Sequence, residues 1–342
     1  MSTSARCLAI GEPGFRPGSR GREAGHGTPS IGRATHLGRG LTIGWLFMFI
    51  LLMAGCARVE RRIVVGSKNF TEQVILGELL AQHIERQTDL RVDRRLNLGG
   101  TFLCHRAITA GEIDLYVEYT GTAYTAILKH DPIGDARQVY QRVKQEYAER
   151  FDLVWMEPLG FNNTFAIVIR GEDARKLHIA TISQAAKYAP RWRAGFGYEF
   201  MERKDGYPGL ARTYGLRFAE PPREMDLGLM YRALRDGRVD LVAGNSTDGL
   251  IAHLDLVVLE DDKHYFPPYE AAPVVRRDTL ARYPALGAAL RQLGGLISEE
   301  EMRRLNYQVD GEHRDVKQVV RDFLDAKHAF LQPESRSREG TE

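Results

Sequence analysis

Polar and aromatic side chains stand directly after two predicted strands, one in each half of the chain. These residues are Tyr119, Thr120 and Thr122 in the first half and Asn245, Ser246 and Asp248 in the second. In α/β proteins the residues just beyond the carboxyl ends of strands contact ligands. Rings, hydroxyls and carboxamides at such places hold a small molecule through ring contacts and hydrogen bonds.

The motifs of common enzyme classes are absent from the sequence. It contains no Gly-x-Ser-x-Gly nucleophile elbow, no Gly-x-x-x-x-Gly-Lys phosphate loop and no Gly-x-Gly-x-x-Gly dinucleotide motif. The ten histidines show no spacing typical of metal ligands, and there is no Cys-x-x-Cys pair. We therefore expect a binding protein without metal or cofactor. A hydrolase that uses a carboxylate and a histidine in a cleft is the enzymatic alternative.

Length and charge fit an ordinary globular protein with two cores. The chain has 342 residues, 43% of them hydrophobic, and a net charge of +2. Single domains typically hold roughly 100–200 residues, so two medium lobes are expected. The near-neutral charge gives no electrostatic preference for nucleic acid, which is therefore not an expected partner.

The first 56 residues indicate an export segment. Residues 1–40 are rich in Gly and Arg without apolar periodicity, so we expect them to be disordered or to precede the true start. The apolar run 41–55 is shorter than the roughly 20 residues of a spanning helix and is typical of a signal peptide. It ends in Leu52-Met-Ala-Gly-Cys56, which resembles the lipobox of bacterial lipoproteins.

The lipobox resemblance implies a signal peptide over residues 41–56 and a lipid on Cys56. Such a protein would be periplasmic or at the cell surface, anchored to the membrane by its lipid. A buried helix with an incidental cysteine is the alternative. After cleavage Cys104 would be the remaining cysteine, so no intramolecular disulfide is expected.

Strands and helices alternate along the rest of the chain, which predicts an α/β fold. We expect strands at 61–67, 90–96 and 113–119, a helix behind the capping-box pattern Asn69-Phe-Thr-Glu72, and a helix at 103–110. An internal repeat relates Ala107-Ile-Thr-Ala-Gly-Glu-Ile-Asp-Leu115 to Ala233-Leu-Arg-Asp-Gly-Arg-Val-Asp-Leu241. Two lobes built on one plan follow.

A shorter repeat supports the same organisation. It relates Gly66-Ser-Lys-Asn-Phe70, after the first strand, to Gly195-Phe-Gly-Tyr-Glu199, after an expected strand in the second half. Chance is the alternative for so short a pattern. The last residues, 331–342, are expected to form a disordered tail.

Five fragments together resemble the glycine betaine, choline and osmoprotectant substrate-binding proteins of ABC transporters. They are Gly66-Ser-Lys-Asn-Phe-Thr-Glu-Gln73, Asn97-Leu-Gly-Gly-Thr101, Gly111-Glu-Ile-Asp-Leu-Tyr-Val-Glu-Tyr-Thr-Gly-Thr122, Ser246-Thr-Asp-Gly249 and Phe266-Pro-Pro-Tyr-Glu-Ala-Ala-Pro273. The resemblance covers residues 62–330.

The resemblance implies a type II periplasmic-binding-protein fold, an α/β architecture of two lobes joined by a hinge of two crossover strands. Lobe 1 would hold residues 62–163 and 271–330, and lobe 2 residues 164–270, with crossovers near 162–167 and 269–275. The implied protein is a monomer that delivers a small quaternary-ammonium ligand to ABC permease and ATPase subunits. A different cationic or zwitterionic solute, or a sensor role, is the alternative.

The same resemblance implies the residues of the site. A quaternary ammonium has no N–H donor, so it is held by aromatic faces, each contact contributing roughly 0.5–2 kcal/mol. The implied rings are Tyr119, Phe165 and Tyr269, with Asn245 in the place of a usual fourth ring. The implied donors to a ligand carboxylate are Lys68, Thr122 and Arg203, the last able to form two parallel bonds. Glu199 and Asp248 are expected to brace the closed lobes.

The change Asn245→Tyr should therefore tighten the binding of glycine betaine. One added ring contact corresponds to an affinity gain of about 2- to 30-fold. Isothermal titration calorimetry measures this gain, with Asn245→Leu as the control that adds bulk without a ring. Equal affinities of Asn245→Tyr and the original protein would contradict a ring position at residue 245.

Overall fold

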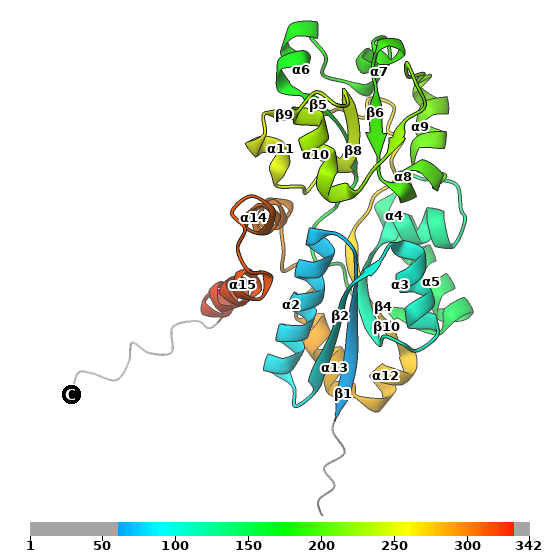
Figure 1. Cartoon of the computed structure of the whole chain (residues 1–342). Helices are drawn as coiled ribbons and strands as arrows, with labels where there is room; N and C mark the ends of the chain where they lie inside the picture. The colour runs from blue at the N-terminus through cyan, green and yellow to red at the C-terminus, as the bar shows by residue number, and fades with distance from the viewer. Residues whose placement is uncertain (1–60, 332–342) are drawn as a thin grey trace, which may run out of the picture. The chain divides into compact units, whose positions relative to one another are not determined.

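The structure is a computed structural model that describes residues 61–331. The expectations for residues 1–40, for the signal peptide 41–56 and for the lipidation of Cys56 lie outside the described residues. The tail expected at 331–342 also lies outside them, except that Leu331 is the last residue of a helix. Two α/β lobes make up the described part, one above the other in Figure 1.

Lobe 1 is built on a five-stranded sheet with the order β2-β1-β3-β10-β4. Its strands are β1 (Arg62–Lys68), β2 (Arg91–Gly99), β3 (Leu115–Tyr119), β4 (Leu153–Trp155) and β10 (Ala271–Arg276). Strands β1, β2 and β3 are parallel, and β10 runs antiparallel to β3 and β4. Its helices are α2 (Thr71–Gln87), α3 (Thr101–Thr109), α4 (Thr120–Thr122), η1 (Ala123–Ile127), α5 (Ala136–Phe151), α12 (Arg277–Arg282) and α13 (Pro284–Arg291).

Lobe 2 is built on a second five-stranded sheet with the order β7-β6-β8-β5-β9. Its strands are β5 (Phe165–Arg170), β6 (Ala194–Phe196), β7 (Arg223–Glu224), β8 (Leu241–Asn245) and β9 (Leu256–Leu259). Its helices are α6 (Gly171–Leu177), α7 (Ile182–Ala185), η2 (Ala189–Arg191), α8 (Tyr198–Glu202), α9 (Tyr207–Tyr214), α10 (Leu227–Arg235) and α11 (Leu250–His253). Two C-terminal helices, α14 (Glu299–Asp310) and α15 (Val316–Leu331), pack on α2.

The chain crosses between the lobes twice, once from β4 to β5 and once from β9 to β10. The two crossing segments pair through an isolated antiparallel bridge between Asn162 and Glu270. This arrangement confirms the expected α/β fold of two lobes joined by a hinge of two crossover strands.

The two lobes follow one plan, as the internal repeat predicted. In each sheet the repeated segment forms the third strand, β3 or β8, and in each the preceding helix stops before a glycine with positive φ, Gly111 or Gly237. Asp114 accepts a hydrogen bond from the backbone N–H of Val64 at 2.7 Å, and Asp240 accepts one from that of Arg193 at 2.9 Å. Both acceptors therefore hold the neighbouring strand segment in the same way.

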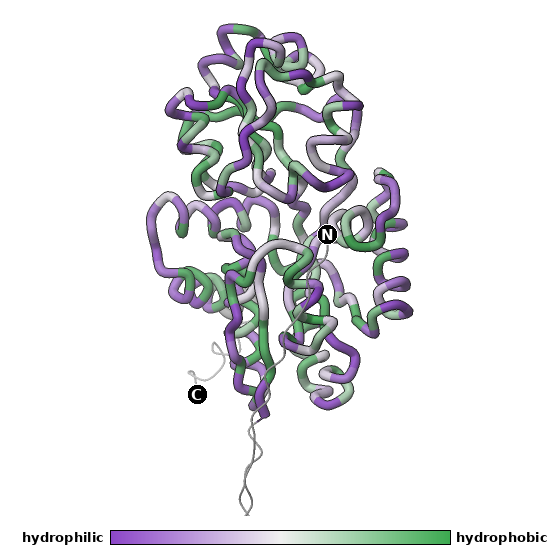
Figure 2. Tube along the Cα trace, turned by 45° about the vertical axis from the view of Figure 1, so that its right-hand side comes forward, coloured by the Kyte–Doolittle hydropathy of each residue, from purple (hydrophilic) through white to green (hydrophobic). Residues whose placement is uncertain are grey.

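Apolar residues cover both faces of each sheet, as a sheet between two helical layers requires. On one face of the lobe 1 sheet, Leu79 and Ile84 of α2 are fully buried, and on the other, Val143 and Tyr147 of α5. Figure 2 shows hydrophobic stretches along the strands and a mixture of hydrophobic and hydrophilic residues on the outer helices. Between residues 61 and 331, no helix combines the length and apolar character needed to cross a bilayer.

The capping box expected at Asn69-Phe-Thr-Glu72 is wrong. Helix α2 begins after Phe70, and no side chain caps its first turn. Glu72 instead points into the interior, where it is 1% exposed. Its carboxylate accepts hydrogen bonds from side chains of distant segments, and these replace the hydrogen bond to the local backbone that a capping box would form.

Candidate ligand-binding cleft

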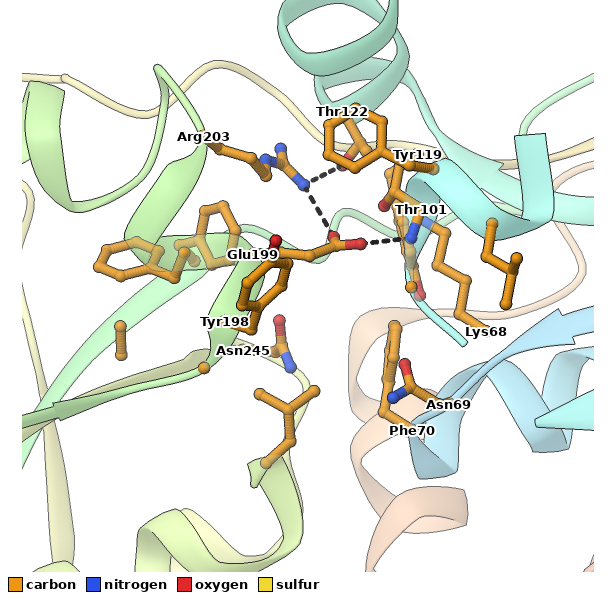
Figure 3. A pocket seen from close by; sticks show the side chains of 18 of the residues that line it. Lys68, Asn69, Phe70, Thr101, Tyr119, Thr122, Tyr198, Glu199, Arg203 and Asn245 are labelled. Carbon is orange, nitrogen blue, oxygen red and sulfur yellow. Dashed lines mark hydrogen bonds and ion pairs between the residues drawn. The ribbon is translucent and has the colours of Figure 1, made fainter. Parts of the chain in front are cut away.

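A cleft of about 730 Å³ lies between the lobes, lined by both of them. Four strand ends border it: Lys68 ends β1, Tyr119 ends β3, Gly197 follows β6 and Asn245 ends β8. Because β1 with β3 and β6 with β8 are parallel pairs, their carboxyl ends open on the same edge of each sheet. The close view in Figure 3 shows side chains from both lobes pointing into this space.

Aromatic rings enter the cleft from both lobes. In lobe 1, Phe70 stacks on Tyr119 with ring centroids 6.4 Å apart. At the crossovers, Phe165 meets Tyr269 edge to face at 5.7 Å and Phe200 at 4.8 Å. The three expected rings, Tyr119, Phe165 and Tyr269, therefore line one cleft.

Arg203 lies against two of these rings. Its guanidinium is 5.0 Å from the centroid of Phe165 and 6.0 Å from that of Tyr269. The resemblance implies that Arg203 binds a ligand carboxylate through two parallel N–H groups. In the structure the Nε and Nη2 atoms of Arg203 both donate to Asp205 instead, at 2.9 and 2.5 Å. The Nη1 atom donates to the Thr122 hydroxyl across the cleft at 3.2 Å. Arg203 thus presents one edge, and not its bidentate fork, to a ligand.

Asp205 joins the lobes through buried hydrogen bonds. Its carboxylate accepts from the hydroxyls of Tyr269 and Thr125, at 2.6 and 2.7 Å. Burial favours the neutral acid, but the Arg203 charge and the hydrogen bonds from Arg203, Tyr269 and Thr125 together outweigh it and hold the pKa of Asp205 below its usual value. The same carboxylate raises the pKa of Arg203 against the effect of burial. The pair is therefore ionised, and Asp205 fixes the Tyr269 ring.

Lys68 also has a partner of opposite charge. Its Nζ donates to Glu118 at 2.5 Å, and both side chains are almost fully buried. The ammonium lies 5.1 Å from the centroid of the Tyr119 ring. The charge of Lys68 is therefore balanced inside the protein before any ligand binds.

Glu72 forms a second buried junction between distant segments. One oxygen accepts from the Tyr119 hydroxyl at 2.6 Å and from Asn163 of the crossover at 2.8 Å. The other accepts from the Thr247 hydroxyl of lobe 2 at 2.5 Å and from Asn306 of α14 at 3.1 Å. Burial raises the pKa of Glu72 despite these donors.

The two residues expected to brace the lobes differ in their contacts. Glu199 accepts a short hydrogen bond from the backbone N–H of Thr101, so it spans the cleft from α8 to α3 (Figure 3). The hydrogen bonds of Asp248 stay within lobe 2, so the bracing role expected for it stays a prediction. Asp248 accepts from the Tyr231 hydroxyl and from the backbone N–H of Asn245.

Asn245 lies beside Phe165, since the two residues pair across β8 and β5. It lines the cleft at the place where the resemblance implies a ring. Its amide nitrogen has only a long contact, 3.5 Å, with Asp248. The Asn245 carboxamide therefore puts a polar group in the cleft lining at the place where the resemblance implies an aromatic ring.

Several residues of the site were not predicted from the sequence. Phe70 and Tyr198 line the cleft and belong to the shorter internal repeat, so that repeat was the available signal. Asp205 is a single acid in a turn segment that no local pattern distinguishes, and the local pattern around Glu72 indicated a helix cap instead. Their importance comes from contacts between segments far apart in the chain.

The described residues offer no arrangement for metal chemistry or a reactive thiol. Within residues 61–331 no group of three His, Cys, Asp or Glu residues is placed to hold a metal ion. Burial raises the pKa of the Cys104 thiol to about 12, which keeps it protonated at neutral pH.

Fold and cleft together define a solute-binding protein with two lobes that hold a ligand between them. Residues 61–326 match the family described as the substrate binding domain of ABC-type glycine betaine transport systems, and the chain belongs to this family. It is therefore an extracytoplasmic substrate-binding component of an ABC importer and not an enzyme. The family expected from the five fragments is confirmed.

Individual relatives show how far the similarity extends. The chain is 36% identical over 287 residues to the ergothioneine transport permease/ergothioneine binding protein of Helicobacter pylori, covering 82% of this chain and 51% of that protein, about half its length. It is 35% identical over 270 residues to the carnitine transport binding protein of Listeria monocytogenes, covering 78% and 87%. The crystal structure of a glycine betaine/carnitine/choline ABC transporter aligns with a TM-score of 0.65 at 35% identity, covering 78% and 99%.

Asp248→Asn should change how stability depends on pH. Burial raises the pKa of Asp248 to about 7, whereas in the unfolded chain it ionises near its usual value. The folded state therefore keeps a proton that the unfolded state releases, so stability falls as pH rises from about 4 to about 7. Asn carries no charge, and the variant should gain about 1–3 kcal/mol relative to the original protein by pH 8, after allowance for partial solvent exposure.

Urea unfolding at pH 5 and pH 8 measures this difference. Asp131→Asn is the control, because the Asp131 side chain is 92% exposed. A stability difference between Asp248→Asn and the original protein that does not grow with pH would contradict the neutral, buried state of Asp248.

Proposed function

We propose that this protein captures a small quaternary-ammonium solute, such as glycine betaine, choline or a relative, in the cleft and delivers it to the permease and ATPase subunits of an ABC importer. The observation that carries the proposal is the convergence of aromatic rings from both lobes on one cleft beside charges that are already paired. We expect the protein to act as a monomer.

A quaternary ammonium suits such rings for a physical reason. Its charge is spread over methyl groups that donate no ordinary hydrogen bond, so it binds to the negative faces of aromatic rings. Phe70, Tyr119, Phe165 and Tyr269 offer rings held by packing or by hydroxyl bonds to buried carboxylates. The guanidinium of Arg203 over Phe165 is an example of a delocalised cation on the same surface.

Polar groups near the rings supply the other half of a zwitterion site. The Nη1 edge of Arg203 and the Thr122 hydroxyl lie together at the cleft. In the described residues, the Thr101 hydroxyl and the Asn163 carbonyl oxygen are buried without a hydrogen-bond partner, and both residues line the cleft. Buried polar atoms of this kind call for a ligand or water.

The relatives are named for ligands of the same class. Ergothioneine, carnitine, glycine betaine and choline appear in the names of similar proteins and structures, and all four carry a trimethylammonium group. This shared group supports the proposed ligand class for this chain.

Removal of the rings tests the proposal. We expect Tyr119→Ala and Tyr269→Ala each to weaken binding of the tightest quaternary amine by about tenfold or more, since each loses a cation–π contact and packing. Calorimetry of the full chain in a non-ionic detergent, against glycine betaine, choline and carnitine, measures the effect. Tyr269→Phe is the control that keeps the ring and should bind more tightly than Tyr269→Ala. Failure of the original protein to bind any quaternary amine would refute the ligand class.

We also propose that Cys56 carries a lipid that anchors the protein to the membrane. The support is the small residues before this cysteine and the apolar run ahead of it. Cys56→Ser should move the protein from the membrane fraction to the soluble fraction and abolish incorporation of labelled fatty acid. Cys104→Ser, at a buried thiol, is the control and should leave both unchanged. Equal labelling of Cys56→Ser and the original protein would contradict the anchor.

A further inference from the structure

A carboxylate of the protein itself lies inside the cleft. Glu199, in the first turn of α8, belongs to lobe 2, and one of its oxygens accepts a hydrogen bond from the backbone N–H of Thr101 in lobe 1. The other oxygen lies 3.9 Å from Nη1 of Arg203. Figure 3 shows the Glu199 carboxylate between these two groups. An acid of lobe 2 therefore reaches a backbone donor of lobe 1 through the space where a ligand binds.

The place that Glu199 occupies suits an anion. Thr101 is the first residue of α3, a helix of 9 residues, and the first backbone N–H groups of a helix attract negative charge. The Thr101 hydroxyl is buried without a hydrogen-bond partner among the described residues, and Thr101 lines the cleft. Gly100 leaves room for the acid, since a Cβ atom there would collide with the Glu199 carboxylate. We call the space bounded by the Gly100 backbone, Thr101 and Nη1 of Arg203 the anion site.

Glu199 is held less firmly than the other acids beside the cleft. Asp205 and Glu118 are fully buried, and each forms an ion pair of 2.5 Å with a cation that lines the cleft. The Glu199 side chain is 27% exposed, and its distance of 3.9 Å from Nη1 of Arg203 is too long for a hydrogen bond. Because Glu199 keeps contact with solvent, its carboxylate can leave the anion site without exchanging a buried state for a hydrated one.

A ligand carboxylate would need the donors that Glu199 faces. The Lys68 ammonium is paired with Glu118, and two nitrogens of Arg203 donate to Asp205. The buried acids leave Nη1 of Arg203 and the start of α3 as donors at the cleft. A ligand carboxylate at these donors would meet the like charge of Glu199 a few ångströms away, which is unfavourable. A ligand hydroxyl in the same place can instead donate a hydrogen bond to Glu199.

We propose that Glu199 is a specificity-determining residue, whose carboxylate fills the anion site as an internal substitute for the carboxylate of a ligand. A quaternary amine with a carboxylate must displace Glu199 or bind beside its charge, whereas one with a hydroxyl does neither. Glu199 thus lowers the affinity for zwitterionic ligands relative to purely cationic ones. This inference rests on the proposed function, because it concerns the other end of the same ligand.

Two ligands that differ at this end test the inference. Glycine betaine carries a carboxylate and choline a hydroxyl, each on the same trimethylammonium group. Glu199→Gln should bind glycine betaine about tenfold or more tightly than the original protein does, because the like charge is gone and the shape is kept. Choline should bind to Glu199→Gln no more tightly than to the original protein. Calorimetry of the full chain in a non-ionic detergent measures the ratio of the two affinities.

The matched control is Glu202→Gln, which removes the same charge from the same helix. Glu202 lies three positions further along α8, where it is exposed and outside the cleft lining. The control should bind both ligands as the original protein does. If Glu199 only braced the lobes, Glu199→Gln would change both affinities by the same factor, and that result overturns the inference.

Acetate gives a second measurement of the anion site. Glu199→Ala leaves the site open, so acetate should weaken the binding of glycine betaine to this variant and not that of choline, compared with sodium chloride at the same ionic strength. In the original protein Glu199 fills the site, and acetate should affect neither ligand. An equal effect of acetate on both ligands, or on both proteins, contradicts the anion site.

The outcomes separate this inference from the proposed function. If quaternary amines bind but the ratio of affinities is the same in Glu199→Gln and the original protein, the role of Glu199 is overturned while the ligand class stands. If neither the original protein nor any variant binds a quaternary amine, the proposed function itself fails. Melting temperatures show whether each variant is folded, and if Glu199→Gln is not, the ratio in Glu199→Ala decides.

Discussion

Burial of carboxylates between the lobes is the constraint on which the rest of the structure depends. A buried charge is costly unless hydrogen-bond donors surround it, so each of these acids requires partners at fixed positions. Asp205 draws its partners from lobe 2, from lobe 1 and from the second crossover. Glu72 draws its partners from lobe 1, the first crossover, lobe 2 and α14. The separation of the lobes and the width of the cleft follow from these bonds.

The same acids orient the rings of the site. The Tyr119 hydroxyl donates a hydrogen bond to Glu72, and the Tyr269 hydroxyl donates one to Asp205. Both rings are therefore fixed in orientation by their hydroxyl groups. A ring held in this way does not lose rotational freedom when a ligand binds, which favours affinity. Groups that never touch the ligand thus prepare the surface that does.

Much of the fold could be predicted because its information is local. Both halves of the sequence contain a helix end, a glycine that terminates the helix and an apolar strand, in that order. The observed sheets place these strands, β3 and β8, at equivalent positions. The rings at strand ends were predictable for the same reason. The cap predicted at Glu72 is wrong, and the role of Asp205 cannot be predicted from its neighbours, because both roles depend on segments 47 to 234 residues away. The partners of Lys68 and Arg203 were missed likewise, since pairing of buried charges is a tertiary property.

The common plan of the two lobes has a consequence for the direction in which a ligand lies. An approximate twofold relation carries β3 onto β8 and β1 onto β6, so a cleft with the same residues on both sides would accept a molecule either way round. The residues at the related places differ: Tyr119 corresponds to Asn245, and Lys68 to Gly197. At the first place lobe 1 offers a ring and lobe 2 an amide, and at the second lobe 1 offers a lysine paired with Glu118 and lobe 2 only backbone. The departure from symmetry gives the cleft a polarity, and a ligand with unlike ends has one preferred orientation in it.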